Sequence, residues 1–340
     1  METPAVSIPG HRMKRVFAYF QLLRLPNVFT AMADVFMGFL VSHGSLRPWK
    51  EFVPLLVASS CLYLSGMVLN DWFDIEVDRV ERPERPLPSG RIPRSHALVL
   101  GIVLVLAGVG IAFCVGSTSR NVALLLAACV LLYDGLLKDS LVGPAIMGLC
   151  RALNVLLGMS SLPGSIWLFQ QNLPQAWRFG TVAAAGVGLY IMSVTRLARS
   201  EAGSNATAQP LSSTLGMNLG LLLIAMIALA LIRMVPVGFE PGEPYWIGAS
   251  IDPSSYSENV RFYGAACLWA AVVLIINGMV WRAMSDPQPA KIQQAVKACI
   301  VSLIGLDAAL VALVNGPVWA CGLLLLLVPT LTLGRWVYST

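Results

Sequence analysis

Long apolar runs separated by short polar segments dominate this chain. Each run is close to the roughly 20 residues that a membrane-spanning helix needs, and the alternating pattern of barrel strands is absent. The pattern therefore predicts an all-α, polytopic membrane bundle of nine helices, or of ten if the last run also spans. The runs can be read at residues 17–42, 52–70, 96–116, 121–137, 141–161, 178–196, 212–235, 260–281, 296–315 and 318–337.

Composition supports an integral membrane protein. Of the 340 residues, 56% are apolar and only 12% are charged, and the mean hydropathy is +0.72. Soluble domains usually have about 25% charged residues. We expect residues 1–15 to form a polar cytoplasmic tail and residues 16–340 to form one transmembrane domain.

The basic residues predict which ends of the helices face the cytoplasm. With the N-terminus inside, fifteen Lys and Arg residues fall in inner regions and six in outer regions, as the positive-inside rule requires. This topology puts the polar segments after runs 52–70, 121–137 and 178–196 on one cytoplasmic face, and we expect the cell inner membrane. The net charge of +5 is modest and forms no dense basic patch, so nucleic-acid binding is not expected.

An acidic motif follows the second apolar run. Asp71, Asp74 and Asp78 are three and four residues apart, so on a helix their carboxylates share one face. Such hard oxygen ligands suit Mg²⁺, which binds through a few carboxylates and the phosphates of a substrate. Alternatively, the motif is a solvated helix face paired with arginines. The arginines that follow could grip phosphate oxygens bidentately: Arg79, Arg82, Arg85 and Arg91.

The run from Asn70 to Asp78, followed by Arg85-Pro-Leu-Pro-Ser-Gly90, resembles the first signature of the UbiA superfamily of intramembrane prenyltransferases. The resemblance implies a helical bundle around a central cavity, with a polyprenyl diphosphate donor held by Mg²⁺. The prenyl group would pass to an aromatic or other lipophilic acceptor in the bilayer. Asp71 and Asp74 would then be catalytic and would hold the metal with Asp78, Asn70 would orient it, and Arg85 would bind diphosphate.

A second element follows the run 121–137. Tyr133 to Lys138 is similar to the family's Tyr…Leu-Lys element, which implies that Tyr133 faces the ionising allylic carbon and that Lys138 contacts diphosphate. Both residues also have ordinary alternatives. A lysine at a helix end commonly reaches lipid headgroups, and tyrosine belongs in the interfacial aromatic belt.

The segment after the run 178–196 departs from the family. Where a second Asp-x-x-x-Asp motif is expected, the chain reads Ser193-Val-Thr-Arg-Leu-Ala-Arg-Ser-Glu201. Either Arg196 and Arg199 replace a metal ion on the diphosphate, with Glu201 as the remaining acidic ligand, or transferase activity is lost. This pattern looks most like the divergent EboC-type UbiA-like proteins. The rival function is therefore a non-catalytic protein of this fold that binds or transports a specialised metabolite.

Several polar residues lie inside the apolar runs. Arg151 and Asn154 share one face of the run 141–161 and are candidate substrate-binding residues, because an arginine at that depth faces a cavity or the bundle interior. Pairing of Arg151 with Asp34 is the structural alternative. We expect structural roles for Asp34 and for Asp307 in the run 296–315.

Overall fold

The computed structural model describes residues 11–162, 175–199, 214, 216–217, 220–221, 258–286 and 288–338, and these contain helices and no strands. The N-terminal half contains α1 (His11–Leu22), the short helix η1 (Leu25–Asn27), α2 (Val28–His43), α3 (Trp49–Phe73), α4 (Ile75–Glu81), α5 (Arg94–Val115), α6 (Ser117–Leu132), the π-helix η2 (Tyr133–Leu137) and α7 (Gly143–Met159). The remainder contains α8 (Gln175–Arg199), α10 (Glu258–Ser285), α11 (Pro289–Asn315), α12 (Pro317–Leu324) and α13 (Leu327–Tyr338).

The all-α membrane architecture predicted from the apolar runs is confirmed. Within the described ranges, eight helical stretches are long and apolar enough to cross a membrane, and α7 is a shorter apolar helix. The predicted run 212–235 lies largely outside the described residues. The last run, 318–337, is divided between α12 and α13, and the first described helix starts at His11, inside the predicted polar tail.

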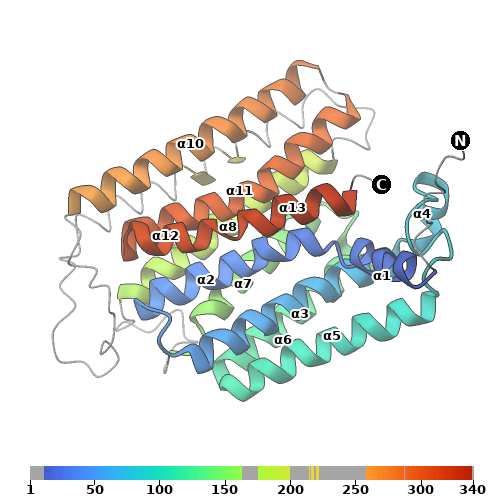
Figure 1. The fold of residues 1–340 in the computed structure, drawn as a ribbon, viewed down its shortest axis with the longest axis horizontal. Helices are drawn as coiled ribbons and strands as arrows, with labels where there is room; N and C mark the ends of the chain where they lie inside the picture. Colours follow the sequence, from blue (N-terminus) through green and yellow to red (C-terminus); the bar gives the residue numbers. More distant parts are fainter. Residues whose placement is uncertain are drawn as a thin grey trace, which may run out of the picture.

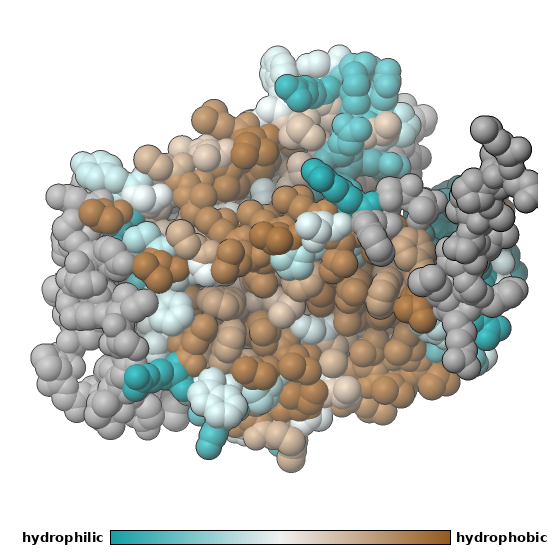
Figure 2. Space-filling model, in the orientation of Figure 1, coloured by the Kyte–Doolittle hydropathy of each residue, from teal (hydrophilic) through white to brown (hydrophobic). Residues whose placement is uncertain are grey.

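The long helices run side by side, with α2, α7, α8 and α11 towards the centre (Figure 1). Burial follows this arrangement. In the most apolar 18-residue window, 72% of the span containing α2 and 67% of α11 are buried, against 17% of α5 and 22% of α10. The outer helices therefore present apolar side chains outward. Figure 2 shows them as a broad hydrophobic surface on the face in view, as expected for helices in contact with lipid.

Two glycines let α7 pack closely against α2. A Cβ atom added at Gly38 would collide with the backbone oxygen of Val155, and one added at Gly158 would collide with the backbone oxygen of Val35. Small residues at such crossings bring membrane helices together, because lipid supplies no hydrophobic force between them. The contact fixes the position of α7, which forms one wall of the cavity described below.

Two predicted continuous helices are broken. The first apolar run is interrupted between α1 and α2, where Arg24 has a left-handed backbone (φ 44°) and Pro26 lies in η1. The second break is at Asp74, between α3 and α4. The three aspartates were expected to share one face of a helix, but Asp71 lies in α3 and Asp78 lies in α4. Asp74 lies at the junction of two helices.

Candidate active site

Three polar segments meet at one end of the bundle. Lys138, which follows η2, forms an ion pair with Asp74 at the end of α3. Arg199, at the end of α8, donates hydrogen bonds to the backbone oxygens of Lys138 and, at 2.7 Å, of Ser140. The structure therefore confirms that the segments after the second, fourth and sixth apolar runs lie together.

A cavity of about 310 Å³ opens at this end and extends between α3, α6 and α7. Eight of the residues predicted to form the site line it: Asn70, Asp74, Arg82, Arg85, Tyr133, Lys138, Arg151 and Asn154. The other lining residues were not predicted from the sequence: Arg24, Leu62, Tyr63, Gly66, Met67, Leu126, Val130, Asp134, Met147 and Cys150.

The three carboxylates of the acidic motif have different partners. Asp71 accepts from Arg24 at 2.6 Å and lies 3.5 Å from Arg85, and Asp78 accepts from the same Arg85 at 2.7 Å. Both carboxylates are buried, with side chains 5% and 3% exposed, and neither lines the cavity. Asp74 does line it and pairs with Lys138.

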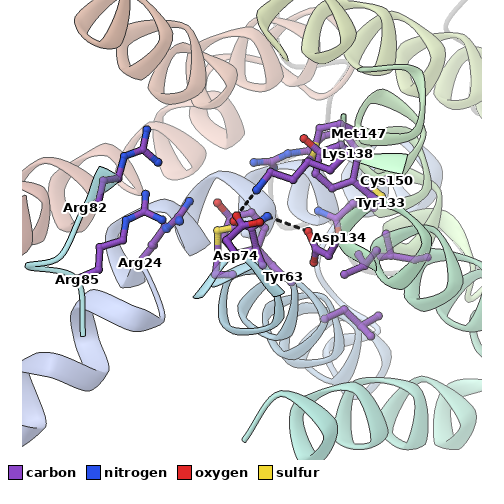
Figure 3. Close-up of a pocket in the computed structure, with 18 residues that line it drawn as sticks. Arg24, Tyr63, Asp74, Arg82, Arg85, Tyr133, Asp134, Lys138, Met147 and Cys150 are labelled. Carbon is purple, nitrogen blue, oxygen red and sulfur yellow. Dashed lines mark hydrogen bonds and ion pairs between the residues drawn. The ribbon is translucent and has the colours of Figure 1, made fainter. Parts of the chain in front are cut away.

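Cationic side chains surround the mouth of the cavity. In Figure 3, Arg24, Arg82 and Arg85 lie on one side of Asp74, and Lys138 lies on the other. Asp71 and Asp78 hold Arg24 and Arg85 in place from behind. Guanidinium groups fixed in this way suit phosphate oxygens, which they bind bidentately. The arrangement gives the cavity a positive rim.

A π-helix brings Tyr133 and Lys138 to the same cavity. The two residues are five positions apart, and in an α-helix side chains at that spacing point to different sides. In η2 the wider i→i+5 turn places both along the cavity wall. Such π-turns within α-helices occur frequently at functional sites. The sequence alone gave no sign of this extra width.

Among the lining residues that were not predicted from the sequence, Asp134 has the clearest chemical character. It follows Tyr133 in η2, lines the cavity, and is 9% exposed. Its Oδ1 atom accepts a hydrogen bond from the Asn70 amide at 3.1 Å. Its Oδ2 atom is buried without a hydrogen-bond partner among the described residues. The only indication of this role in the sequence was its position next to Tyr133, which was predicted to lie in the site.

A buried network of polar side chains lies at the deep end of the cavity. Arg151 donates to Asp34 at 2.8 Å and to Thr30 at 2.8 Å, and its guanidinium lies 5.2 Å from the ring centroid of Tyr63. Asn154 donates to the same Asp34 carboxylate at 3.0 Å. The alternative pairing of Arg151 with Asp34 is thus confirmed, and Arg151 also lines the cavity.

The described residues of the altered second motif do not line the cavity, unlike Asn70 and Asp74 of the first motif. Arg196 is exposed, and Arg199 binds the carbonyl groups that precede α7; neither lines the cavity. Glu201 lies outside the described residues. In the structure, therefore, Arg199 supports the backbone of Lys138, and direct contact of Arg196 or Arg199 with a diphosphate remains a prediction.

The oxygen donors near the rim suit Mg²⁺ only with help from a substrate. No group of three or more His, Cys, Asp or Glu side chains in the described ranges is placed to hold a metal by itself. Mg²⁺, however, usually binds through one or two carboxylates, several waters and substrate phosphates. Asp74 with the neighbouring Asn70, facing a rim of phosphate-binding cations, is compatible with that mode.

These features define a class of protein: a multi-pass membrane bundle with a cation-rimmed cavity that continues between apolar helices. The sequence model described as the UbiA prenyltransferase family matches residues 31–263. The chain belongs to this family, and it is an integral membrane protein.

Curated relatives share the family. A digeranylgeranylglyceryl phosphate synthase of Sulfurisphaera tokodaii is 36% identical over 48% of this chain and 59% of its own length. One from Sulfolobus acidocaldarius is 40% identical over 42% of this chain and 52% of its own length. The chain thus spans just over half of these relatives. The enzyme of the same name from Methanopyrus kandleri is 29% identical over 87% of this chain and 99% of its own length.

Solved structures share the fold. A UbiA homologue from Aeropyrum pernix has a TM-score of 0.60 at 15% identity, covering 84% of this chain and 97% of its own. A structure of digeranylgeranylglyceryl phosphate synthase has a TM-score of 0.54 at 17% identity, covering 89% and 99%. The names of these proteins do not bear on the predicted closeness to EboC-type proteins, which stays a prediction.

Proposed function

We propose that this protein is an intramembrane prenyltransferase that transfers a prenyl group from a polyprenyl diphosphate to a lipophilic acceptor. One observation carries the proposal: the cavity joins a rim of four cationic side chains to a wall that runs inward between apolar helices. The rim suits a diphosphate and the wall suits a hydrocarbon chain. The cationic residues are Arg24, Arg82, Arg85 and Lys138.

The acceptor that we propose is a hydroxyl-bearing glycerophosphate lipid. The relatives from S. tokodaii and M. kandleri are named digeranylgeranylglyceryl phosphate synthase, a name that describes two prenyl groups on a glyceryl phosphate. A second phosphate group would also find cationic partners among the four basic side chains of the rim. An aromatic acceptor is the alternative that the family allows.

Mg²⁺ is the proposed cofactor. An Archaeoglobus fulgidus UbiA homologue of the same fold, 13% identical with a TM-score of 0.52, is bound to geranyl diphosphate and Mg²⁺. In this chain Asp74 and Asn70 would hold the ion beside the cavity, and Asp71 and Asp78 are the further carboxylates of the motif. When bound, the ion would neutralise charge on the leaving diphosphate.

The chain's own residues account for the rest of the proposed mechanism. Arg24, Arg82, Arg85 and Lys138 bind and orient the diphosphate, so that its departing charge meets fixed positive groups. Tyr133 lies in the cavity wall, where an aromatic ring can stabilise the allylic cation. Apolar residues such as Val130 and Met147 exclude water, which would otherwise capture the cation.

We further propose that the cavity opens to the cytoplasm in the cell inner membrane. The basic residues of the chain support this orientation, because the segments around the cavity mouth are rich in arginine. A phosphorylated, water-soluble headgroup would then reach the rim from the cytoplasmic side.

The test uses the full chain purified into lipid nanodiscs. Geranylgeranyl diphosphate, geranylgeranylglyceryl phosphate and Mg²⁺ are added, and mass spectrometry detects the doubly prenylated product. We expect product only when Mg²⁺ is present, and a loss of at least about 100-fold in Asp74→Asn, since electrostatic stabilisation of a leaving group commonly contributes that much. Glu76→Gln is the matched control, because that side chain is 66% exposed and pairs with Arg79.

The outcomes separate the proposal from its rival. Tight, Mg²⁺-dependent donor binding without diphosphate release, tested with a panel of alcohol and aromatic acceptors, would favour a binding or transport protein. Equal turnover in Asp74→Asn and wild type would remove the proposed role of the cavity.

A further inference from the structure

Two fully buried carboxyl groups face each other where α2 packs against α11. Asp34 and Asp307 are both 0% exposed, and neither lines the cavity. Their side chains lie within hydrogen-bonding reach of each other, and the two helices are neighbours at the centre of the bundle (Figure 1). The Asp34–Asp307 pair is therefore separate from the rim, where Asp74 and Asn70 face the proposed Mg²⁺ site.

Three of the four carboxyl oxygens in this pair have no hydrogen-bond donor among the described residues. They are Oδ1 of Asp34 and both oxygens of Asp307. The fourth, Oδ2 of Asp34, accepts from Arg151 at 2.8 Å and from Asn154 at 3.0 Å. Two ionised carboxylates cannot satisfy each other, because neither has a hydrogen atom to donate.

The charges of this network do not balance if both acids are ionised. Arg151 interacts with both carboxyl groups and supplies one positive charge. The two carboxylates would supply two negative charges, which leaves a net charge of −1 inside the membrane-spanning bundle. An uncompensated buried charge is costly, and where two carboxylates share a buried site one of them usually retains a proton. One further positive charge between the two acids would make the network neutral.

A proton fits this position better than a metal ion. It needs two oxygen atoms, one that carries it and one that accepts its hydrogen bond, and the pair supplies both. Mg²⁺ takes about six oxygen ligands and Ca²⁺ about six to eight, whereas the pair offers three oxygens without a donor. A substrate phosphate could not complete the set, because neither Asp34 nor Asp307 lines the cavity.

We infer that Asp34 and Asp307 form a proton-binding site in the core of the bundle, with one proton shared between their facing carboxyl groups. Asp34 stays the anion, because Arg151 and Asn154 already donate to it. The proton is therefore carried by Asp307, whose O–H group donates to Asp34 Oδ1. Forming the site takes up one proton from water, and no other covalent bond changes.

The bound proton makes the deep wall of the cavity electrically neutral. Arg151 lines that wall beside the ring of Tyr63, and with Asp307 protonated it faces a single carboxylate. A neutral network behind the wall suits an apolar ligand in the cavity. The proton site itself holds whether or not the protein transfers prenyl groups.

Infrared spectroscopy tests the site directly, because a protonated carboxyl group has a C=O absorption band that a carboxylate lacks. The full chain is purified at neutral pH in a detergent without carbonyl groups, and wild type is compared with Asp307→Asn. The asparagine amide keeps the shape of the acid and can donate to Asp34 Oδ1. Asp286→Asn is the matched control, because Asp286 is an exposed aspartate that pairs with Lys291.

We expect the spectrum of wild type minus that of Asp307→Asn to contain this band, with the intensity of one carboxyl group per chain. The same subtraction with Asp286→Asn should lack it. The thermal unfolding midpoint of Asp307→Asn should stay close to that of wild type. The midpoint of Asp307→Leu should be lower, because leucine leaves Asp34 Oδ1 buried without a donor.

Three results would overturn the proton site. The first is a difference spectrum for Asp307→Asn without the band. The second is a wild-type midpoint that rises when Na⁺ replaces choline, with no such rise in Asp307→Asn, which would assign the pair to a metal cation. The third is failure of Asp307→Asn to fold, because a neutral amide should replace a neutral acid. Prenyl transfer enters none of these readouts, so failure of the proposed function is a separate outcome.

Discussion

At the scale of single residues, the cavity mouth depends on carboxylates that hold arginines. Asp71 and Asp78 are almost fully buried and share Arg85, and Asp71 also pairs with Arg24, whose backbone is left-handed. A left-handed non-glycine residue costs roughly 1–2 kcal/mol, which the surrounding contacts of Arg24 must offset. The motif thus positions cations as well as offering metal ligands.

The variant Asp78→Asn tests whether Asp78 mainly positions Arg85 or binds the metal ion. If Asp78 mainly positions Arg85, the variant weakens donor binding about tenfold, because a charge-assisted bond worth roughly 1.5–3 kcal/mol is reduced. The Mg²⁺ concentration needed for half-maximal activity should then stay close to that of wild type. Isothermal titration with geranylgeranyl thiodiphosphate at several Mg²⁺ concentrations measures both quantities. A large rise in the Mg²⁺ requirement would instead support the original prediction that Asp78 is a metal ligand.

The buried pair of Asp34 and Arg151 allows a second prediction. The Asp34 side chain is fully buried, and that of Arg151 is 9% exposed. Removing one partner of such a pair leaves an uncompensated charge, at a cost of about 3–5 kcal/mol. Asp34→Asn should therefore lower the thermal unfolding midpoint of the protein in detergent.

The double variant Asp34→Asn/Arg151→Gln supplies the control for that prediction. It removes both charges together, so it should be more stable than Asp34→Asn alone, as expected for coupled residues. A double variant that is less stable than the single one would show that the ion pair does not dominate the stability of this network.

At the scale of elements, the position of α7 depends on its glycines. At Gly158 an added Cβ atom would meet the backbone of Val35, so Gly158→Ala must push α2 and α7 apart. We expect a loss of about 1–3 kcal/mol, the usual cost of overpacking, seen as a lower unfolding midpoint. Gly110→Ala on α5 is the matched control, because no atom lies within 4 Å of its added Cβ. Equal midpoints for the two variants would contradict this close packing.

The sequence predicted whole helices better than their interruptions. Apolar runs identified most spans, since lipid demands long apolar segments. The sequence did not reveal the break at Arg24, because the residues on both sides are apolar and continue the hydrophobic pattern. Pro26 was the only local signal for a break there. Nor did the sequence reveal the π-helix at Tyr133–Leu137, whose hydrogen-bond pattern depends on how the helix packs. These interruptions place Arg24 and Asp134 in the cavity, which is why both were missed.

At the scale of the whole molecule, the predicted orientation in the membrane can be tested directly. Glu84 is exposed near the cavity mouth, and Lys50 is exposed at the start of α3, at the other end of that helix. In intact cells, Glu84→Cys should resist a membrane-impermeant maleimide until the cells are opened, whereas Lys50→Cys should react at once. The wild-type chain measures labelling of the native cysteines. The reverse pattern would place the cavity mouth outside the cell.

Each role assigned above to a residue of the cavity rim depends on a diphosphate entering the cavity. The most direct measurement is an experimental structure with Mg²⁺ and geranylgeranyl thiodiphosphate bound in nanodiscs. We expect the diphosphate between Arg82, Arg85 and Lys138, with the ion against Asp74 and the prenyl chain along α3 and α6. A diphosphate bound elsewhere, with this cavity filled by lipid alone, would contradict this expectation.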